Sequence, residues 1–286
     1  MQTPNLEKLA RQGVILNQHY VLPTCTPTRA ALLTGRYPYK MGMQVRTTHL
    51  LRKCMNELCM VKVSVRLEGR TLLFKGNDTF FVARWHLGYC NLSLTPTRRG
   101  FDTFRGYYLG SQDYFSHTAS GGKNSPEAAG YDYWKNESVD YSAQGHYSTY
   151  LIADHVIETI EDKSKKNGSL FLYVAFQAAH APTQVPRGYQ ANCSSHANKK
   201  RVRLCEMTDA MDHAVGRIVR KLKDAHMWNN CLLVFMSDNG GQVRYGGNNW
   251  PLRGNKNTLY EGGTRVPAFV SGPLLKRPNT TSSRRV

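Results

Sequence analysis

Apolar runs of strand length alternate with amphipathic helical segments in the second half of the chain, and this alternation limits the folds that it can adopt. The runs at 169–176, 231–237 and 266–272 have the length and composition of buried strands. Residues 147–165 and 203–226 place apolar side chains at helical intervals on one face. Strands that alternate with helices indicate an α/β domain with a mostly parallel sheet.

The first half contains shorter elements of the same two kinds. A helix is predicted over 3–13, because Thr3 can cap its start and Gly13 can end it. A second helix is predicted over 27–35, with Pro27 in its first turn. The other predictions for this half are strands at 13–21, at 61–67 and within 79–88, and loop or irregular surface at 105–146.

The composition favours an anionic partner. The chain has 286 residues and a net charge of +18, and its 41% hydrophobic content excludes a wholly disordered chain. Nucleic acid and a sulfated or acidic polysaccharide are both candidates. No zinc-finger spacing, basic zipper or aromatic RNA-binding motif occurs, and the basic residues are scattered, so nucleic acid is the weaker hypothesis. No window approaches the ~18 apolar residues of a membrane span.

Cysteines and glycosylation sequons favour the secretory pathway. Six cysteines remain when Cys25 is set aside, and none forms a paired C-x-x-C metal motif. Six N-x-[ST] sequons occur, at Asn77, Asn91, Asn136, Asn167, Asn192 and Asn279, and we expect these asparagines to be exposed. The N-terminus has no apolar signal-peptide segment. We therefore expect the chain to lack its natural start.

Polar side chains follow two of the predicted strands. Asp238 and Asn239 come directly after the strand at 231–237, and their oxygens suit Ca²⁺ or Mg²⁺. The same Asp-Asn-Gly sequence is also typical of a tight turn, which is the simpler interpretation when it is taken alone. His180 follows the strand at 169–176, where a surface or hydrogen-bonded histidine is the alternative to a catalyst. Ligands in parallel sheets bind beyond such strand ends.

Three further residues have both a functional and a structural interpretation. Arg84 and His86 alternate on a predicted strand and are therefore expected to face the same side. The structural alternative for this pair is a packing cluster around the tryptophan between them. Lys256 is a candidate anion ligand, and the alternative is a solvated loop lysine.

Cys25 lies where an anion is expected to bind. Pro27 fixes the first turn of the predicted helix at 27–35, and the free N–H groups of that turn favour a sulfate or phosphate. Arg29, one turn further on, can reach the same anion with two parallel hydrogen bonds. A buried or disulfide-bonded cysteine is the structural alternative for Cys25. Cysteine itself attacks a sulfate ester poorly, so an unmodified thiol does not explain how residue 25 could act as a nucleophile.

Four segments of the chain resemble those of a known enzyme family. "CTPTRAALLTGRYP", "RWHLG", "LTPTRRGFDTF" and "SDNGG…GGNNWPLRGNKNTLYEGG" occur in the order found in the formylglycine-dependent type I sulfatases. The chain resembles this family over residues 2–44 and about 79–286, and its second half is most similar to arylsulfatase B and its near relatives. The resemblance implies an alkaline-phosphatase-like three-layer sandwich of the α/β class.

The resemblance also implies roles for the candidate residues around the nucleophile. Cys25 would be converted to formylglycine by a formylglycine-generating enzyme, and the hydrate would be the nucleophile. Arg29 and His86 would hold the hydrate, and His180 would protonate the leaving alcohol. The ester would be cleaved in two steps, through a covalent sulfate ester that then releases sulfate.

Further implied roles concern the metal, the sulfate and the location. Asp238 and Asn239 would bind Ca²⁺, and Lys256 and Arg84 would bind the substrate sulfate. The substrate would be an aryl sulfate or a sulfated carbohydrate, and the nearest resemblance points to sulfated N-acetylgalactosamine in glycosaminoglycans. The expected location is lysosomal or extracellular, with no nucleic acid partner.

The sequence departs from the family pattern in several places. The family begins with a strand that ends in two adjacent aspartates, and no Asp-Asp pair occurs in this sequence. Thr28 replaces the usual serine and keeps the hydroxyl, while Arg84 replaces the lysine of K-W-H and changes the donor geometry. Residues 45–78 are atypical for the family. Residues 1–286 are therefore expected to be part of an N-terminal catalytic domain, without the family's smaller C-terminal domain.

These departures lead to expectations about stability and metal binding. Without the aspartate pair, the site is expected to hold Ca²⁺ weakly. Without the first strand, the runs at 169–176 and 231–237 are expected to expose apolar surface. Three functions compete. The first is a sulfatase. The second is a sulfatase-like protein that binds sulfated glycans without cleaving them. The third is a phosphoesterase of the same superfold, which would favour Ser or Thr at position 25.

Overall fold

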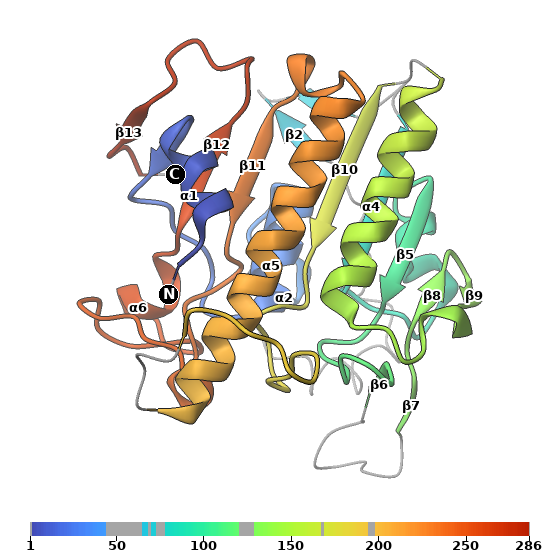
Figure 1. The fold of residues 1–286 in the computed structure, drawn as a ribbon, viewed down its shortest axis with the longest axis horizontal. Helices are drawn as coiled ribbons and strands as arrows, with labels where there is room; N and C mark the ends of the chain where they lie inside the picture. Colours follow the sequence, from blue (N-terminus) through green and yellow to red (C-terminus); the bar gives the residue numbers. More distant parts are fainter. Residues whose placement is uncertain are drawn as a thin grey trace. The chain divides into compact units, whose positions relative to one another are not determined.

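Two sheets organise the chain, and each belongs to a different compact unit. The computed structural model describes residues 2–43, 65–67, 70–72, 78–119, 129–166, 169–193 and 198–285. The first unit comprises Met1–Cys25, Ile157–Ser164 and Thr183–Val286, and the second comprises Thr26–Val156 and Lys165–Pro182. Figure 1 shows the elements of both units in the colours of the sequence.

The sheet of the first unit joins the two ends of the chain. Its strands are β11 (Leu233–Met236), β12 (Ala268–Ser271), β1 (Val14–Leu16) and β13 (Thr280–Ser282), in that order. β1 runs parallel to β13 and antiparallel to β12, and β12 runs antiparallel to β11. The blue N-terminal strand therefore pairs with two strands from the red end of the chain (Figure 1).

Helices α1 (Pro4–Arg11) and α5 (Lys199–Asp224) pack together in this unit through a buried carboxylate. Asp212 in α5 is fully buried and accepts hydrogen bonds from the backbone N–H groups of Asn5 (3.0 Å) and Leu6 (2.7 Å). The first N–H groups of a helix have no partner within the helix, and they carry the positive end of its dipole. Asp212 therefore caps α1, a role that Thr3 was predicted to fill and for which its side chain makes no hydrogen bond.

The sheet of the second unit has the order β10-β4-β5-β8-β9. These strands are β10 (Leu170–Ala175), β4 (Asp78–Arg84), β5 (Thr103–Tyr107), β8 (Trp134–Lys135) and β9 (Ser138–Val139). β10, β4 and β5 are parallel, and β8 and β9 continue antiparallel. Phe81 of β4 lies in the centre of an aromatic core, against the rings of Phe101, Phe104 and Trp85.

The remaining helices and strands are short apart from two. α2 (Cys25–Thr34) buries Ala30 and Leu33 in the core of the second unit, and α4 (Ser148–Ser164) buries Ile152 and Val156. The short elements are β2 (Val65–Leu67), β3 (Arg70–Leu72), β6 (Thr118–Ala119), β7 (Gly130–Tyr131), α6 (Glu261–Thr264) and 3-10 turns at Pro38–Met41, Leu92–Leu94, Pro96–Arg98, Tyr141–Ala143, Trp228–Asn230 and Val243–Tyr245.

The α/β class predicted from the sequence is confirmed, with mixed rather than mostly parallel sheets. α2 begins at Cys25 instead of 27, so the cysteine itself lies in the first turn. α5 begins at Lys199 instead of 203, because the Asn198 side chain accepts from the N–H groups of Lys200 and Arg201. The strand β13 was not predicted. Most of the atypical segment 45–78, including Asn77, lies outside the described residues.

The prediction that 105–146 is loop or irregular surface was wrong. Short strands cross this segment, and Tyr107, Tyr114 and Tyr133 are completely buried. Its Gly, Ser and Asn content is typical of loops. Its many tyrosines instead bring large ring surfaces into the core, since a tyrosine ring is mostly apolar.

The runs that form β10 and β11 were predicted to be buried strands, but they are only partly buried. Each is the end strand of its sheet, and the β10 residues are mostly half-buried. Val234 in β11 is 59% exposed, and Leu232 just before it is 54% exposed. Apolar surface is therefore partly accessible along both strands.

The cysteines divide into one disulfide and several thiols. Cys193 and Cys205 form a disulfide, while Cys25, Cys90 and Cys231 are thiols that take part in no disulfide among the described residues. The four sequon asparagines that the structure describes, Asn91, Asn136, Asn192 and Asn279, are all exposed. Cys54, Cys59 and the sequon at Asn167 lie outside the described residues. In the described part of the chain, no helix is both long and apolar enough to span a bilayer.

Candidate active site

Three of the predicted site residues meet in the first unit. Cys25 is 4% exposed, and its Sγ lies 3.1 Å from Oδ1 of Asn239 and 3.3 Å from Nζ of Lys256. The thiol donates to the amide oxygen, and the ammonium donates to the sulfur. Residues more than 200 positions apart thus bring a hydrogen-bond acceptor and a cation to the side chain at the start of α2. A cation at this position can neutralise negative charge that develops beside residue 25.

The loop after β11 holds Asn239 and Lys256 through its backbone. The Ser237 hydroxyl donates to the Asn239 carbonyl oxygen (2.9 Å), and the Lys256 N–H donates to the Gly241 carbonyl oxygen (3.2 Å). Gly240 packs so closely against Gly262 that an added Cβ would collide with the Gly262 carbonyl oxygen. The backbone bends at Asp238 and Asn239, and this bend positions the Asn239 amide.

The side chains at this bend form only part of a calcium site. Asp238 is half-buried beside Asn239, and the Asn239 Oδ1 already accepts from the thiol. Among the residues that the structure describes, no group of three His, Cys, Asp or Glu side chains could hold a metal ion. Ca²⁺ takes ~6–8 oxygen ligands. One carboxylate and one amide do not meet that requirement, so the described residues do not complete a calcium site.

A second cluster of predicted residues lies deep in the second unit. Arg29 NH1 donates to the backbone oxygen of Arg84 (2.8 Å), and Arg84 NH2 lies 3.0 Å from Nδ1 of His86. The three residues are at most 8% exposed. A guanidinium group can only donate, so Nδ1 of His86 accepts, and a neutral His86 carries its proton on Nε2.

His86 meets Arg84 for a different reason from the one predicted. β4 ends at Arg84, and His86 lies beyond it with a φ of 60°, in the left-handed region. A non-glycine residue in this region costs about 1–3 kcal/mol and is found most often at functional sites. The ring packs against Gly110, where an added Cβ would lie 2.5 Å from Nε2. Glycine at 110 is therefore required for this orientation of the imidazole.

His180 is oriented by its own loop. It follows β10, and its Nδ1 lies 2.7 Å from the Ala181 carbonyl oxygen, which can only accept. Nδ1 therefore carries a proton, and Nε2 is the nitrogen that gains or loses one when the ring changes between its neutral and imidazolium forms. The buried Tyr114 hydroxyl donates to the His180 carbonyl oxygen (2.8 Å) and fixes the backbone there.

Sequence reasoning missed the supporting residues Thr26, Gly110 and Tyr114. Thr26 Oγ1 lies 3.4 Å from both ring nitrogens of His86, and it belongs to the quoted segment around Cys25. No sequence signal marked Gly110 or Tyr114, because both lie in the stretch that was predicted to be irregular surface.

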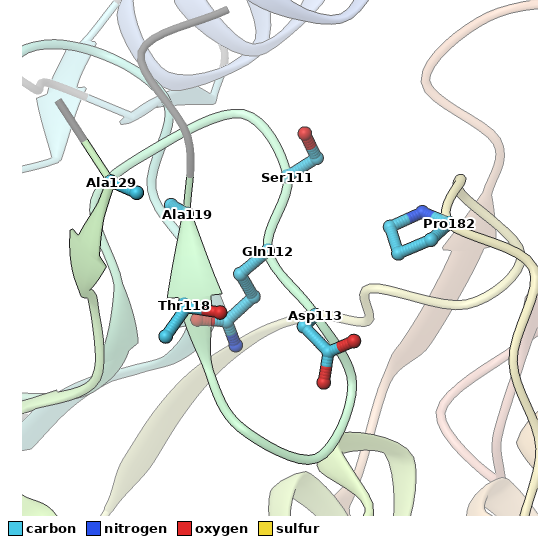
Figure 2. A pocket seen from close by; sticks show the side chains of 7 residues that line it. All are labelled: Ser111, Gln112, Asp113, Thr118, Ala119, Ala129 and Pro182. Atoms are coloured by element: carbon cyan, nitrogen blue, oxygen red, sulfur yellow. The ribbon is translucent and has the colours of Figure 1, made fainter. Parts of the chain in front are cut away.

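A cavity of about 250 Å³ lies in the second unit and was not predicted. Figure 2 shows its lining side chains, Ser111, Gln112, Asp113, Thr118, Ala119, Ala129 and Pro182. Asp113 is held in place because its Oδ1 accepts from the N–H groups of Phe115 (2.9 Å) and Ser116 (2.8 Å). Pro182 is two residues beyond His180, so the cavity lies beside the loop that carries this histidine.

Comparison with known proteins places this geometry in one family. The Sulfatase family model matches residues 1–286. Arylsulfatase J of Mus musculus is 39% identical over the whole of this chain and 46% of its own length, and N-acetylgalactosamine-6-sulfatase of Sus scrofa is 28% identical over 95% of this chain and 52% of its own. The crystal structure of Ps i-CgsB in complex with k-i-k-neocarrahexaose superposes with a TM-score of 0.83 at 31% identity, covering 99% of this chain and 63% of that one. The chain thus spans about half the length of these curated relatives. On this family match and these similarities, the chain belongs to the sulfatase family.

Proposed function

We propose that residues 1–286 form part of the catalytic domain of a sulfuric ester hydrolase, in which residue 25 acts as formylglycine. The observation that carries this proposal is the position of the Cys25 sulfur, between the Asn239 amide oxygen and the Lys256 ammonium. The sulfur stands where an oxygen of the hydrated aldehyde would be. Formylglycine supplies a geminal diol, of which one oxygen attacks the sulfate sulfur and the other expels sulfate afterwards.

The residues of the chain prepare the ester for that chemistry. Lys256 binds the anionic sulfuryl group and stabilises the negative charge that grows on its oxygens. Asn239 accepts a hydrogen bond from the nucleophilic group and fixes its direction. His180 gives the proton on Nε2 of its imidazolium form to the leaving alcohol, so that the S–O bond breaks without releasing an alkoxide.

The buried cluster of Arg29, Arg84 and His86 has a supporting role in this proposal. Its hydrogen bonds fix each partner before substrate arrives, and preorganised donors lower a barrier more than mobile ones. Arg29 lies one turn after residue 25 in α2. Arg29 and His86 hold the hydrate, and Arg84 contributes positive charge toward the sulfate.

The proposed substrate is a sulfated carbohydrate, with sulfated N-acetylgalactosamine in glycosaminoglycans as the first candidate. The relatives named for an N-acetylgalactosamine sulfatase and for a complex with a neocarrahexaose support this class, and so does the net charge of +18. The disulfide and the four exposed sequons support the secretory pathway, with a lysosomal or extracellular location.

Mass spectrometry of the tryptic peptide that contains residue 25, after secretory expression, tests the proposal. We expect the peptide to carry an aldehyde in place of the thiol and the protein to hydrolyse an aryl sulfate. A Cys25→Ser variant made in the same cells is the matched control. Hydrolysis by a protein whose Cys25 is entirely unmodified would exclude the formylglycine mechanism.

A second candidate function is binding of sulfated glycans without turnover. The incomplete oxygen ligand set around Asp238 favours it, since no group of three His, Cys, Asp or Glu side chains among the described residues could hold a metal ion. Tight binding of a sulfated oligosaccharide together with no hydrolysis by the aldehyde-containing protein would select this function. A phosphoesterase is the least favoured candidate, and hydrolysis of an aryl phosphate but not an aryl sulfate would select it.

A further inference from the structure

One tryptophan of this chain is almost fully exposed. Trp250 has 84% of its surface accessible, whereas Trp85 is buried and Trp134 and Trp228 are half-buried. Tryptophan is on average a highly buried residue, because its ring is large and mostly apolar. A single exposed apolar side chain is common on protein surfaces, so the exposure of Trp250 gains meaning only from its surroundings.

The loop that carries Trp250 is held firmly by hydrogen bonds. The Asn249 side chain accepts from the Gly241 N–H (2.8 Å) and donates to the Gly241 carbonyl oxygen (2.9 Å). The Trp250 N–H donates to Oδ1 of Asn248 (3.0 Å), and the Leu252 N–H donates to the Asn249 carbonyl oxygen (2.8 Å). The ring is therefore presented to solvent by an ordered backbone, so little further ordering is needed to bind a flat partner.

The same backbone connects Trp250 to the candidate reaction site. Gly241, which the Asn249 side chain clamps, follows Asn239 by two residues. Its carbonyl oxygen also accepts from the Lys256 N–H (3.2 Å). The exposed Trp250 ring and the Lys256 ammonium beside Cys25 thus belong to one hydrogen-bonded loop.

This loop carries positive charge. Residues 239–260, which lie between Asp238 and Glu261, include Arg244, Arg253 and Lys256 and no Asp or Glu. Arg253 stacks over the Tyr260 ring at 4.0 Å, which keeps its guanidinium group extended on the surface. At the start of α5, Lys200 and Arg201 donate to the carbonyl oxygens of Arg244 and Gly246 and add positive charge beside the loop. An anionic partner is favoured over a neutral one.

We infer that Trp250 is a stacking platform for a pyranose ring of an anionic glycan, next to the sugar whose sulfate is cleaved. One face of a pyranose presents C–H groups with slight positive charge, which fit the negative face of the indole ring. Sulfate or carboxylate groups around the sugar would lie toward the cations of the loop. This inference deepens the proposed function and rests on it for the position of the cleaved sugar.

The test is a fluorescence titration of the full chain with a chondroitin sulfate hexasaccharide, in a Cys25→Ala background that prevents turnover. Trp250→Ala is expected to raise the dissociation constant about tenfold, equivalent to about 1.4 kcal/mol. Trp250→Phe is expected to restore most of the affinity, because a smaller aromatic face remains. Leu259→Ala removes an equally exposed aliphatic side chain (85%) from the same segment and is expected to leave binding unchanged.

Three results would overturn the inference. These are an unchanged dissociation constant for Trp250→Ala, an equal loss for Leu259→Ala, and no binding of the hexasaccharide by the parent protein. Since affinity is measured without hydrolysis, these results are separate from a failure of the sulfatase proposal. That failure would appear as an absence of aryl sulfate hydrolysis by the aldehyde-containing protein.

Discussion

The cluster around Cys25 and the cluster around His86 are both joined by hydrogen bonds, but they lie in different settings. Asn239 and Lys256 reach the Cys25 sulfur from a half-buried loop that backbone hydrogen bonds hold. Arg84 and His86, in contrast, are buried on either side of Trp85, which belongs to the aromatic core. Loss of a side chain from the first cluster is expected to change stability little, whereas loss of one from the second is expected to lower it. The difference separates residues that carry chemistry from residues that position it.

The largest effect is expected from Cys25→Ala. The variant loses the nucleophile, so aryl sulfate turnover should fall by at least about 10⁴-fold, as it does when an enzyme loses its nucleophilic side chain. Stability should change little, because the first turn of α2 tolerates alanine and the substitution removes the hydrogen bonds of a single thiol. Turnover measured beside a thermal melt checks both expectations, and a large fall in melting temperature would contradict the proposed contrast between the clusters.

Lys256→Ala is expected to have the second largest effect. Removal of one donor to a developing charge typically costs about 10²–10³ in kcat. Lys256→Arg keeps the charge but changes the donor geometry and should lose less. Steady-state kinetics on an aryl sulfate distinguish the two variants. If Lys256→Ala retained full kcat, Lys256 would be a solvated loop lysine, which was the alternative from the sequence.

Arg29→Met tests the buried cluster. This substitution leaves the Arg84 carbonyl oxygen without its 2.8 Å donor, and a buried hydrogen bond to a charged group is worth about 1.5–3 kcal/mol. The free energy of unfolding in urea should fall by that amount while the circular dichroism at low denaturant stays unchanged. Full stability together with lost turnover would instead show that Arg29 acts directly in the reaction and does not only position other residues.

The sequence predicted most of the long helices and strands and named candidate site residues, but it did not predict which of those candidates contact one another. Local patterns identified α1, α4 and β4, since capping residues and apolar spacing act over a few positions. The approach of Lys256 to Cys25 spans 231 positions, and no local pattern reports it. The place of β11 at the end of its sheet was likewise not predicted, because an apolar strand has the same sequence pattern at the end and in the centre of a sheet.

Supporting contacts were the hardest to predict. Tyr114 was assigned to irregular surface because its neighbours are small and polar, yet its buried hydroxyl fixes the His180 backbone. Asp212 looked like an ordinary charge on a helix, yet it caps α1 across 206 positions of sequence. Both contacts depend on packing of distant segments, whereas the sequence patterns describe single elements.

The smallest effect is expected from a buried histidine that takes no part in either cluster. His155 in α4 is 5% exposed, and burial lowers its pKa from 6.5 to about 3. The folded protein therefore keeps His155 neutral, while the unfolded chain takes up a proton as the pH falls below 6.5. Between pH 6.5 and about 3 the unfolded state binds more protons, so this residue makes stability fall as the pH falls. At pH 5 the loss is about 2 kcal/mol.

His155→Gln removes this titration and should flatten the dependence of the unfolding free energy on pH between 6.5 and 5. Buried His117, whose pKa burial also lowers, remains in the variant and accounts for residual slope. Urea unfolding at both pH values, with the surface variant His213→Gln as the matched control, measures the change in slope. An unchanged slope would show that the acid sensitivity of the second unit arises elsewhere.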